Sequence, residues 1–198
     1  MFKKLTFIIA LLASCQAFAG SNTSKYDSLS IGDYDEDSGV YVQLVKSGSS
    51  DESGRGVNDS VSKSGSYVPN INMFIYNPKD DAGRYLLDKN YGEITDYLLE
   101  TSYSDGSFSY FATKRKVLNN SSISKRAINP NVLIETYHTK TNTYTVWKAN
   151  KLAGAAKALF SYQLPSQWHL DAKNQVIRLI SPTISNQQPQ LKVTNFVW

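Results

Sequence analysis

Apolar and polar residues alternate most regularly between Asn131 and Ser181. This region contains the segments NVLIETYH, TYTVWKAN, AAKALFSYQ, WHLD and VIRLIS, which carry β-branched and aromatic residues at alternate positions and are bounded by Asn, Gly, Pro or Lys. Alternation between such turn residues is typical of β-strands that bury one face. The region therefore predicts an antiparallel meander.

A shorter strand-rich block precedes the meander. NMFIYN and RYLLD flank a turn marked by Pro78 and Gly83, which predicts a hairpin, and SFSYFATKRKVL alternates as a strand. GEITDYLLETSY fits either a strand or a short helix, but its aromatic end and the Ser-Asp-Gly turn after it favour a strand. The final QLKVTNFVW predicts a last strand tied into a sheet.

The first residues have the pattern of an export signal. Two lysines precede an apolar run over Leu5–Ala13, which is too short to span a bilayer, and Ala17–Ala19 supplies a small-x-small cleavage pattern. Residues 1–19 are therefore predicted to be a signal peptide, and the protein is expected to be periplasmic or secreted. Leu12–Cys15 also resembles a lipobox, so the alternative is a membrane-anchored lipoprotein lipidated at Cys15. Cys15 is the single cysteine, which excludes a disulfide bond within the chain.

Residues 20–66 form a polar leader. It contains a predicted hairpin with an acidic turn at Asp33–Gly39 and a second arm at Val40–Val45, and its first arm carries Tyr26, Leu29 and Ile31. Residues 47–66 are rich in Ser, Gly, Asp and Asn and predict a flexible linker. Residues 67–198 are then expected to form one compact β domain.

FIYNPKDDAGRYLL and VWKANKLAGAAKALF share an aromatic strand end, a turn containing Gly and an apolar return strand. They resemble the inner hairpins of TolB-like β-propeller blades. The resemblance implies hairpins of blade type, and no functional residue is transferred from that family. Because a closed propeller needs four or more blades of about forty residues, the length favours an open meander, a sandwich or a partial propeller-like sheet. The expected fold class is all-β, with a polar flexible N-terminal region.

The formal net charge of +4 is spread along the chain. Lys114–Lys116 is the only dense basic cluster, and we interpret it as a solvated strand end in preference to a phosphate or anionic-surface contact. Nucleic-acid binding requires Lys and Arg clustered on one face, so no nucleic-acid partner is expected. The only membrane contact expected is the lipid anchor at Cys15.

Asp33, Asp35 and Asp37 alternate as calcium ligands do in a tight loop. However, the glycine comes one position late, at Gly39, and Leu44 occupies the position of the bidentate glutamate. The pattern therefore favours an acidic hairpin turn over a calcium site of another kind. No cofactor is expected.

His169 and Asp171 are the candidate catalytic residues. On a strand they point to the same face, where the aspartate could orient the imidazole as a general base. The chain contains no Gly-x-Ser-x-Gly motif or Gly-rich phosphate loop, so the alternative is a histidine hydrogen-bonded beside a turn.

Aromatic residues of the meander are the candidate binding residues. Such residues can line a carbohydrate- or peptide-binding face, although on a sheet they more often form cross-strand pairs or core. The candidates are Tyr137, Tyr144, Trp147 and Trp168.

Two functions are compatible with these patterns. The favoured hypothesis is an exported, non-catalytic binding module for another envelope or secreted protein, such as an inhibitor or immunity-type partner. The alternative is an envelope hydrolase or glycan-processing enzyme that uses His169 and Asp171.

Overall fold

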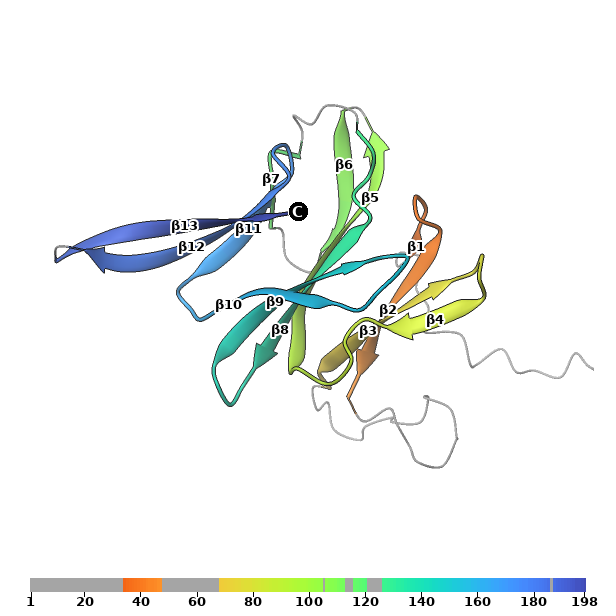
Figure 1. Ribbon diagram of the computed structural model, residues 1–198, viewed down its shortest axis with the longest axis horizontal. Helices are drawn as coiled ribbons and strands as arrows, with labels where there is room; N and C mark the ends of the chain where they lie inside the picture. The colour runs from red at the N-terminus through yellow and green to blue at the C-terminus, as the bar shows by residue number, and fades with distance from the viewer. Residues whose placement is uncertain (1–33, 48–67, 105, 113–115, 121–125, 186) are drawn as a thin grey trace, which may run out of the picture. The chain divides into compact units, whose positions relative to one another are not determined.

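The computed structural model describes residues 34–47, 68–104, 106–112, 116–120, 126–185 and 187–198 (Figure 1). The expected signal peptide, Cys15, the first arm of the leader hairpin, Asp33 and the linker from residue 48 lie outside the described residues. Within the described ranges, no helix is long and apolar enough to cross a membrane.

The described residues form three sheets, in which β7 and β11 are the one parallel pair. The first sheet contains β1 (Tyr34–Asp35), β2 (Val40–Lys46), β3 (Asn70–Asn77) and β4 (Ala82–Tyr85), in that order. The central sheet has the order β10-β9-β8-β5-β6 and contains β5 (Glu93–Ser104), β6 (Ser107–Ala112), β8 (Asn131–His138), β9 (Thr143–Asn150) and β10 (Lys157–Tyr162). The C-terminal sheet has the order β13-β12-β11-β7 and contains β7 (Val117–Leu118), β11 (Gln167–Asp171), β12 (Val176–Ser185) and β13 (Gln188–Val197).

The expectation of an all-β, antiparallel fold is confirmed. The ambiguous segment GEITDYLLETSY is strand β5, and the described sheets do not close into a propeller. The structure divides the expected meander, because β8–β10 belong to the central sheet and β11–β13 to the C-terminal sheet. The connection between β10 and β11 contains a cis Leu164–Pro165 peptide bond, and the Ser166 N–H donates to the Gln163 carbonyl across this turn.

The central sheet is buried on both faces. On β8, Val132 and Ile134 pack with Ile75 of the first sheet, whereas Leu133 points the other way and packs with Leu170 of the C-terminal sheet. Burial on both faces explains why the strand begins with a continuous apolar run instead of a strict alternation. It also places the side chain of Glu135, which follows this run, in the protein interior.

The leader hairpin differs from the expectation at its turn. Asp35 was expected in an acidic turn, but it is a buried strand residue of β1 that pairs with Val40. The turn therefore begins after Asp35, and Gly39 closes it with a φ of 72°, a conformation that favours glycine. The physical reason is that the Asp35 carboxylate has a buried cationic partner, Lys151.

Candidate functional site

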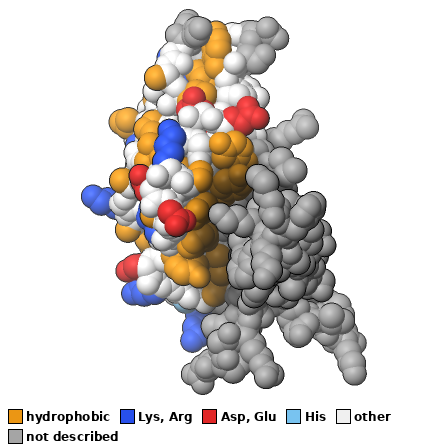
Figure 2. Space-filling view, turned by 90° about the vertical axis from the view of Figure 1, so that its right-hand side faces the viewer, with side chains coloured by type: hydrophobic (Ala, Val, Ile, Leu, Met, Phe, Trp, Pro, Cys, Tyr) orange, Lys and Arg blue, Asp and Glu red, His pale blue; other side chains and the backbone are white. Residues whose placement is uncertain are grey.

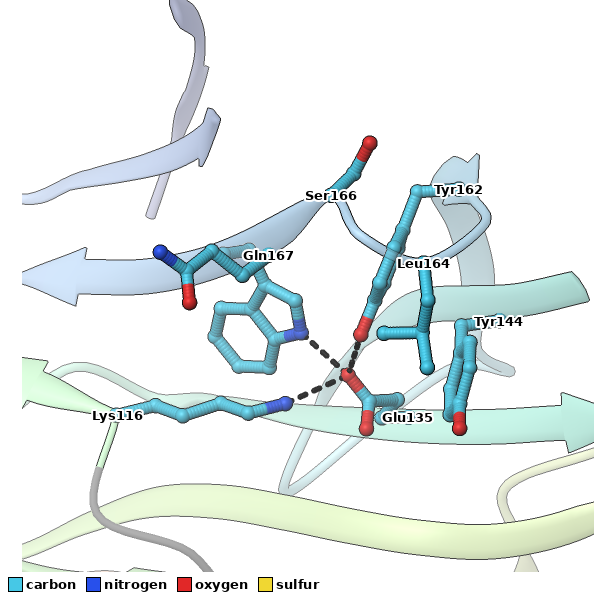
Figure 3. A pocket seen from close by; sticks show the side chains of 8 residues that line it. Lys116, Glu135, Tyr144, Tyr162, Leu164, Ser166 and Gln167 are labelled. Carbon is cyan, nitrogen blue, oxygen red and sulfur yellow. Dashed lines mark hydrogen bonds and ion pairs between the residues drawn. The ribbon is translucent and has the colours of Figure 1, made fainter. Parts of the chain in front are cut away.

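Glu135, at the centre of β8, is the hub of a buried polar network (Figure 3). Its side chain is 1% exposed. The Glu135 Oε2 atom accepts hydrogen bonds from Lys116 Nζ at 2.6 Å, the Tyr162 hydroxyl at 2.6 Å and Trp168 Nε1 at 2.5 Å, whereas Oε1 accepts one from the Thr95 hydroxyl at 2.8 Å. The donors come from β5, β10, β11 and the residue before β7, so a single carboxylate connects the central and C-terminal sheets.

Lys116 makes further contacts in this network. Its ammonium lies 4.4 Å from the centre of the Trp168 ring and 3.7 Å from Asp96 Oδ2. Its side chain is 17% exposed, so our interpretation of Lys116 as a solvated strand end is wrong. The reason is the buried negative charge of Glu135, which lies in an apolar strand distant in the sequence. Lys114 and Arg115 lie outside the described residues.

The network fixes the protonation of its members. Burial by itself would raise the pKa of Glu135, but the charge of Lys116 and the hydrogen bonds from Lys116, Tyr162 and Trp168 outweigh burial and lower it. Burial and the hydrogen bond to Glu135 raise the pKa of the Tyr162 hydroxyl, which therefore stays a proton donor. Glu135 is thus a stable carboxylate and a poor general base, because an efficient base has a pKa near the working pH.

A small pocket of about 170 Å³ opens beside Glu135. Beyond the network, Tyr144, Leu164, Ser166 and Gln167 line it. Leu164 is 67% exposed. The pocket is too small for a drug-sized ligand, and its charged groups already bind one another. The geometry therefore supports a structural role for Glu135 more than a catalytic one.

The structure gathers three of the four candidate aromatic residues on one face. Trp168 and Tyr144 line the pocket, and the Tyr137 ring lies 4.7 Å from Tyr144. Tyr162 continues this row at 5.2 Å from Tyr144. The rings therefore pack mainly on one another, as cross-strand pairs do.

Trp147 lies on the opposite face of β9 from Tyr144, because the two residues are an odd number of positions apart. Its ring is 4.3 Å from Tyr91, and its Nε1 donates to the Thr136 hydroxyl at 2.9 Å. Trp147 thus belongs to the core shared with the first sheet and not to the pocket.

His169 and Asp171 do lie on the same face of β11, as the strand register requires. The Asp171 carboxylate accepts hydrogen bonds from Asn119 at 3.0 Å, Asn174 at 2.8 Å and Arg178 at 3.0 Å. Burial by itself would raise the pKa of Asp171, but these hydrogen bonds outweigh burial and lower it. Burial and the charge of Arg178 lower the pKa of His169. Asp171 is thus engaged by a turn and by Arg178, which leaves little support for a role in orienting His169.

Two of the three aspartates weighed as calcium ligands are described, and they differ in burial. Asp33 lies outside the described residues, Asp37 is exposed, and the buried Asp35 accepts hydrogen bonds from Lys151 and Ser38. No group of three or more His, Cys, Asp or Glu side chains among the described residues could hold a metal ion.

A second candidate site is one face of the β12–β13 hairpin, whose paired strands continue beyond the last residue of β12 that pairs with β11, Ile180 (Figure 1). The strand register is continuous from Val176↔Val197 to Ser185↔Gln188. Residues that pair directly lie on the same face, so the register defines an apolar surface, here named the ribbon face. The ribbon face consists of Ile180, Pro182, Ile184, Pro189, Leu191 and Val193.

The opposite side of the same hairpin changes character along its length. Near the base, Ile177, Leu179 and Phe196 pack into the core. Beyond them the side chains are polar, including Thr183, Gln190 and Lys192. The distal ribbon is therefore polar on the side that continues the core-facing surface and apolar on the other side.

The first sheet also carries aromatic side chains on its outer face. The Tyr41 ring lies 4.7 Å from Tyr34 and 6.3 Å from Tyr76, and Phe74 packs against Tyr85 at 5.3 Å. Figure 2 shows the side of the molecule on which β1 and β4 lie in Figure 1, with hydrophobic side chains among scattered charged ones. The rings meet at tilted or edge-to-face angles, which indicates cross-strand packing.

No protein-family model, curated protein or solved structure matches this chain.

Proposed function

We propose that this chain is an exported, non-catalytic protein-binding module that contacts its partner through the ribbon face. One observation carries the proposal. Eight large hydrophobic side chains are strongly exposed among the described residues, and three of them, Ile184 at 81%, Leu191 at 71% and Val193 at 51%, lie on the ribbon face. A fourth, Val197 at 76%, lies on the same side nearer the base of the hairpin.

Exposed apolar side chains are common singly, but a contiguous group on one face indicates an interaction surface. Removing apolar surface from water is favourable by about 25 cal/mol for each square ångström, and the entropic cost of association is subtracted from this gain. A two-stranded ribbon without a third strand or a covering layer is only marginally stable in water, so a partner would also stabilise the ribbon itself.

The chemistry of the ribbon face indicates the kind of partner. All six of its side chains are apolar, and the nearby polar groups lie at its border, where Arg178 and Asn195 pair at the base of the hairpin. Specific interfaces commonly combine an apolar centre with a polar rim. The partner surface is therefore apolar and uncharged at its centre, and it belongs to another envelope or secreted protein if the N-terminal segment acts as an export signal.

The alternative function, a hydrolase based on His169 and Asp171, has less support. The hydrogen bonds of Asp171 are made with Asn119, Asn174 and Arg178.

The first test is photocrosslinking in the native host. A photoreactive amino acid at Leu191 should crosslink to one partner protein, whereas the same amino acid at Gln190, which is exposed on the opposite side of the ribbon, should not. Crosslinks to a second copy of the chain alone would replace the proposed partner with self-association. Equal crosslinking from both positions, or none from either, would contradict the proposal.

A further inference from the structure

The described residues include one lysine that is almost completely buried, together with a buried aspartate. The Lys151 side chain is 1% exposed and the Asp35 side chain 0%, and Lys151 Nζ lies 2.7 Å from Asp35 Oδ2. Lys151 Nζ also donates to the Glu100 backbone carbonyl, and the Ser38 hydroxyl donates to Asp35 Oδ2. The second carboxylate oxygen, Asp35 Oδ1, is buried and accepts no hydrogen bond from a described residue.

The backbone holds both residues in place. The Lys151 N–H donates to the Pro130 carbonyl at 2.7 Å, and the Lys151 carbonyl accepts from Arg84 Nη2 at 2.9 Å. Asp35 is paired with Val40 in the β1–β2 ladder, and its carbonyl accepts from the Gly39 N–H at 2.8 Å. Reacting groups that are fixed at contact distance behave as if their effective concentration were very high.

The hydrogen bonds around this pair suit an amide better than an ion pair. A buried ion pair is costly unless its remaining donors and acceptors are satisfied, and Asp35 Oδ1 is not. In an amide between the two side chains, the remaining N–H would donate to the Glu100 carbonyl. The remaining oxygen, Asp35 Oδ2, would accept from Ser38. The amide would therefore leave no unpaired polar atom and no charge at this position.

We propose that Lys151 and Asp35 condense into an intramolecular isopeptide bond. A proton passes from the Lys151 ammonium to the Asp35 carboxylate, which leaves a neutral amine and a neutral acid. The amine nitrogen attacks the carboxyl carbon, the C–N bond forms and the bond from carbon to Oδ1 breaks. Oδ1 leaves as water, which carries the acid proton and one amine proton, so the reaction requires no oxidant or other co-reactant.

This bond would tie β1 to the end of β9. The two residues are 116 positions apart, so the crosslink would close a long loop and restrict the unfolded chain strongly. A disulfide cannot have this role, because the chain contains one cysteine.

Peptide mass spectrometry of the purified full chain tests the proposal. Trypsin cannot cleave after an acylated lysine, so residues 149–157 should remain one peptide and be joined to residues 26–46. The joined species should weigh one water molecule less than the sum of its two peptides. Recovery of residues 149–151 and 26–46 as separate peptides in place of the joined species would overturn the proposal.

Variants assign the bond to its two residues. Lys151→Arg keeps the positive charge but removes the amine, and Asp35→Ala removes the carboxyl group, so each should abolish the joined peptide. Asp35→Asn should give the same joined peptide, because ammonia can leave in place of water. Asp37→Ala, at an exposed aspartate of the same turn, is the control and should retain the bond.

Persistence of the joined peptide in Lys151→Arg or Asp35→Ala would contradict the assignment. If either variant fails to fold, the digest of the wild-type chain still decides the question. The isopeptide bond would lie in the interior, whereas the ribbon face lies on the surface. A result that excludes the bond would therefore leave the proposed function untouched.

Discussion

Glu135 joins the central and C-terminal sheets through its buried carboxylate. Its carboxylate accepts hydrogen bonds from four side chains, and it balances the charge of the mostly buried Lys116. Breaking a buried pair by removing one charge leaves the other uncompensated, which costs about 3–5 kcal/mol.

We therefore expect Glu135→Gln to lower the free energy of unfolding by about 3 kcal/mol or more. The measurement is urea denaturation followed by tryptophan fluorescence. Glu36→Gln, at an exposed position, is the matched control and should change stability by less than about 0.5 kcal/mol. Equal stability of the two variants would show that the Glu135 network contributes little.

The lowered pKa values of Glu135 and Asp171 predict sensitivity to acid. A carboxylate whose pKa is lower in the folded state stabilises the protein above its unfolded pKa, about 4, and this contribution is lost as the pH falls through the folded pKa. The free energy of unfolding should therefore fall with pH below about 4. Asp171→Asn should show a shallower fall, and a curve parallel to that of the wild type would contradict this explanation.

The contacts of individual residues could be predicted from the sequence less well than the strands. Asp35 and Trp168 were recognised as chemically notable, but their partners, Lys151 and Glu135, are 116 and 33 positions away in the sequence. Glu135 had a local signal that could have been used, since a carboxylate inside the apolar run of NVLIETYH predicts a buried, compensated charge.

At the scale of elements, the β-branched and aromatic segments between turn residues predicted the strands well. The segments NVLIETYH and TYTVWKAN coincide with β8 and β9. The division between β10 and β11 could not be predicted, because strand patterns indicate which face is buried but not which sheet covers it. Similarly, the two-residue strand β7 is too short for periodicity to reveal.

The distal part of the β12–β13 ribbon should be dispensable for folding. We propose removing residues 182–191 and joining Ser181 to Lys192 through Asn-Gly. These two residues are directly paired and lie an even number of positions from the distal pair Ser185↔Gln188, so a tight hairpin turn fits there. The free energy of unfolding should change by less than about 1 kcal/mol, because mainly exposed side chains are lost. A large loss measured by urea denaturation would show that the ribbon is part of the folded core.

At the scale of the whole molecule, two apolar clusters share the central sheet. The described residues all belong to one compact unit, so we expect a single cooperative unfolding transition. Far-ultraviolet circular dichroism and tryptophan fluorescence should therefore give the same urea midpoint. Two separated midpoints would show that the C-terminal sheet unfolds independently, in which case the Glu135 network does not couple it to the rest.

The central claim is that the ribbon face binds a partner protein. Its most direct test is the affinity of the purified chain for the partner identified by crosslinking, measured for Leu191→Ser and for Gln190→Ser on the opposite side. We predict that Leu191→Ser weakens binding about tenfold or more, equivalent to about 1.4 kcal/mol, whereas Gln190→Ser leaves the affinity unchanged. Equal affinities of the two variants, with both folded as the wild type is, would contradict the account.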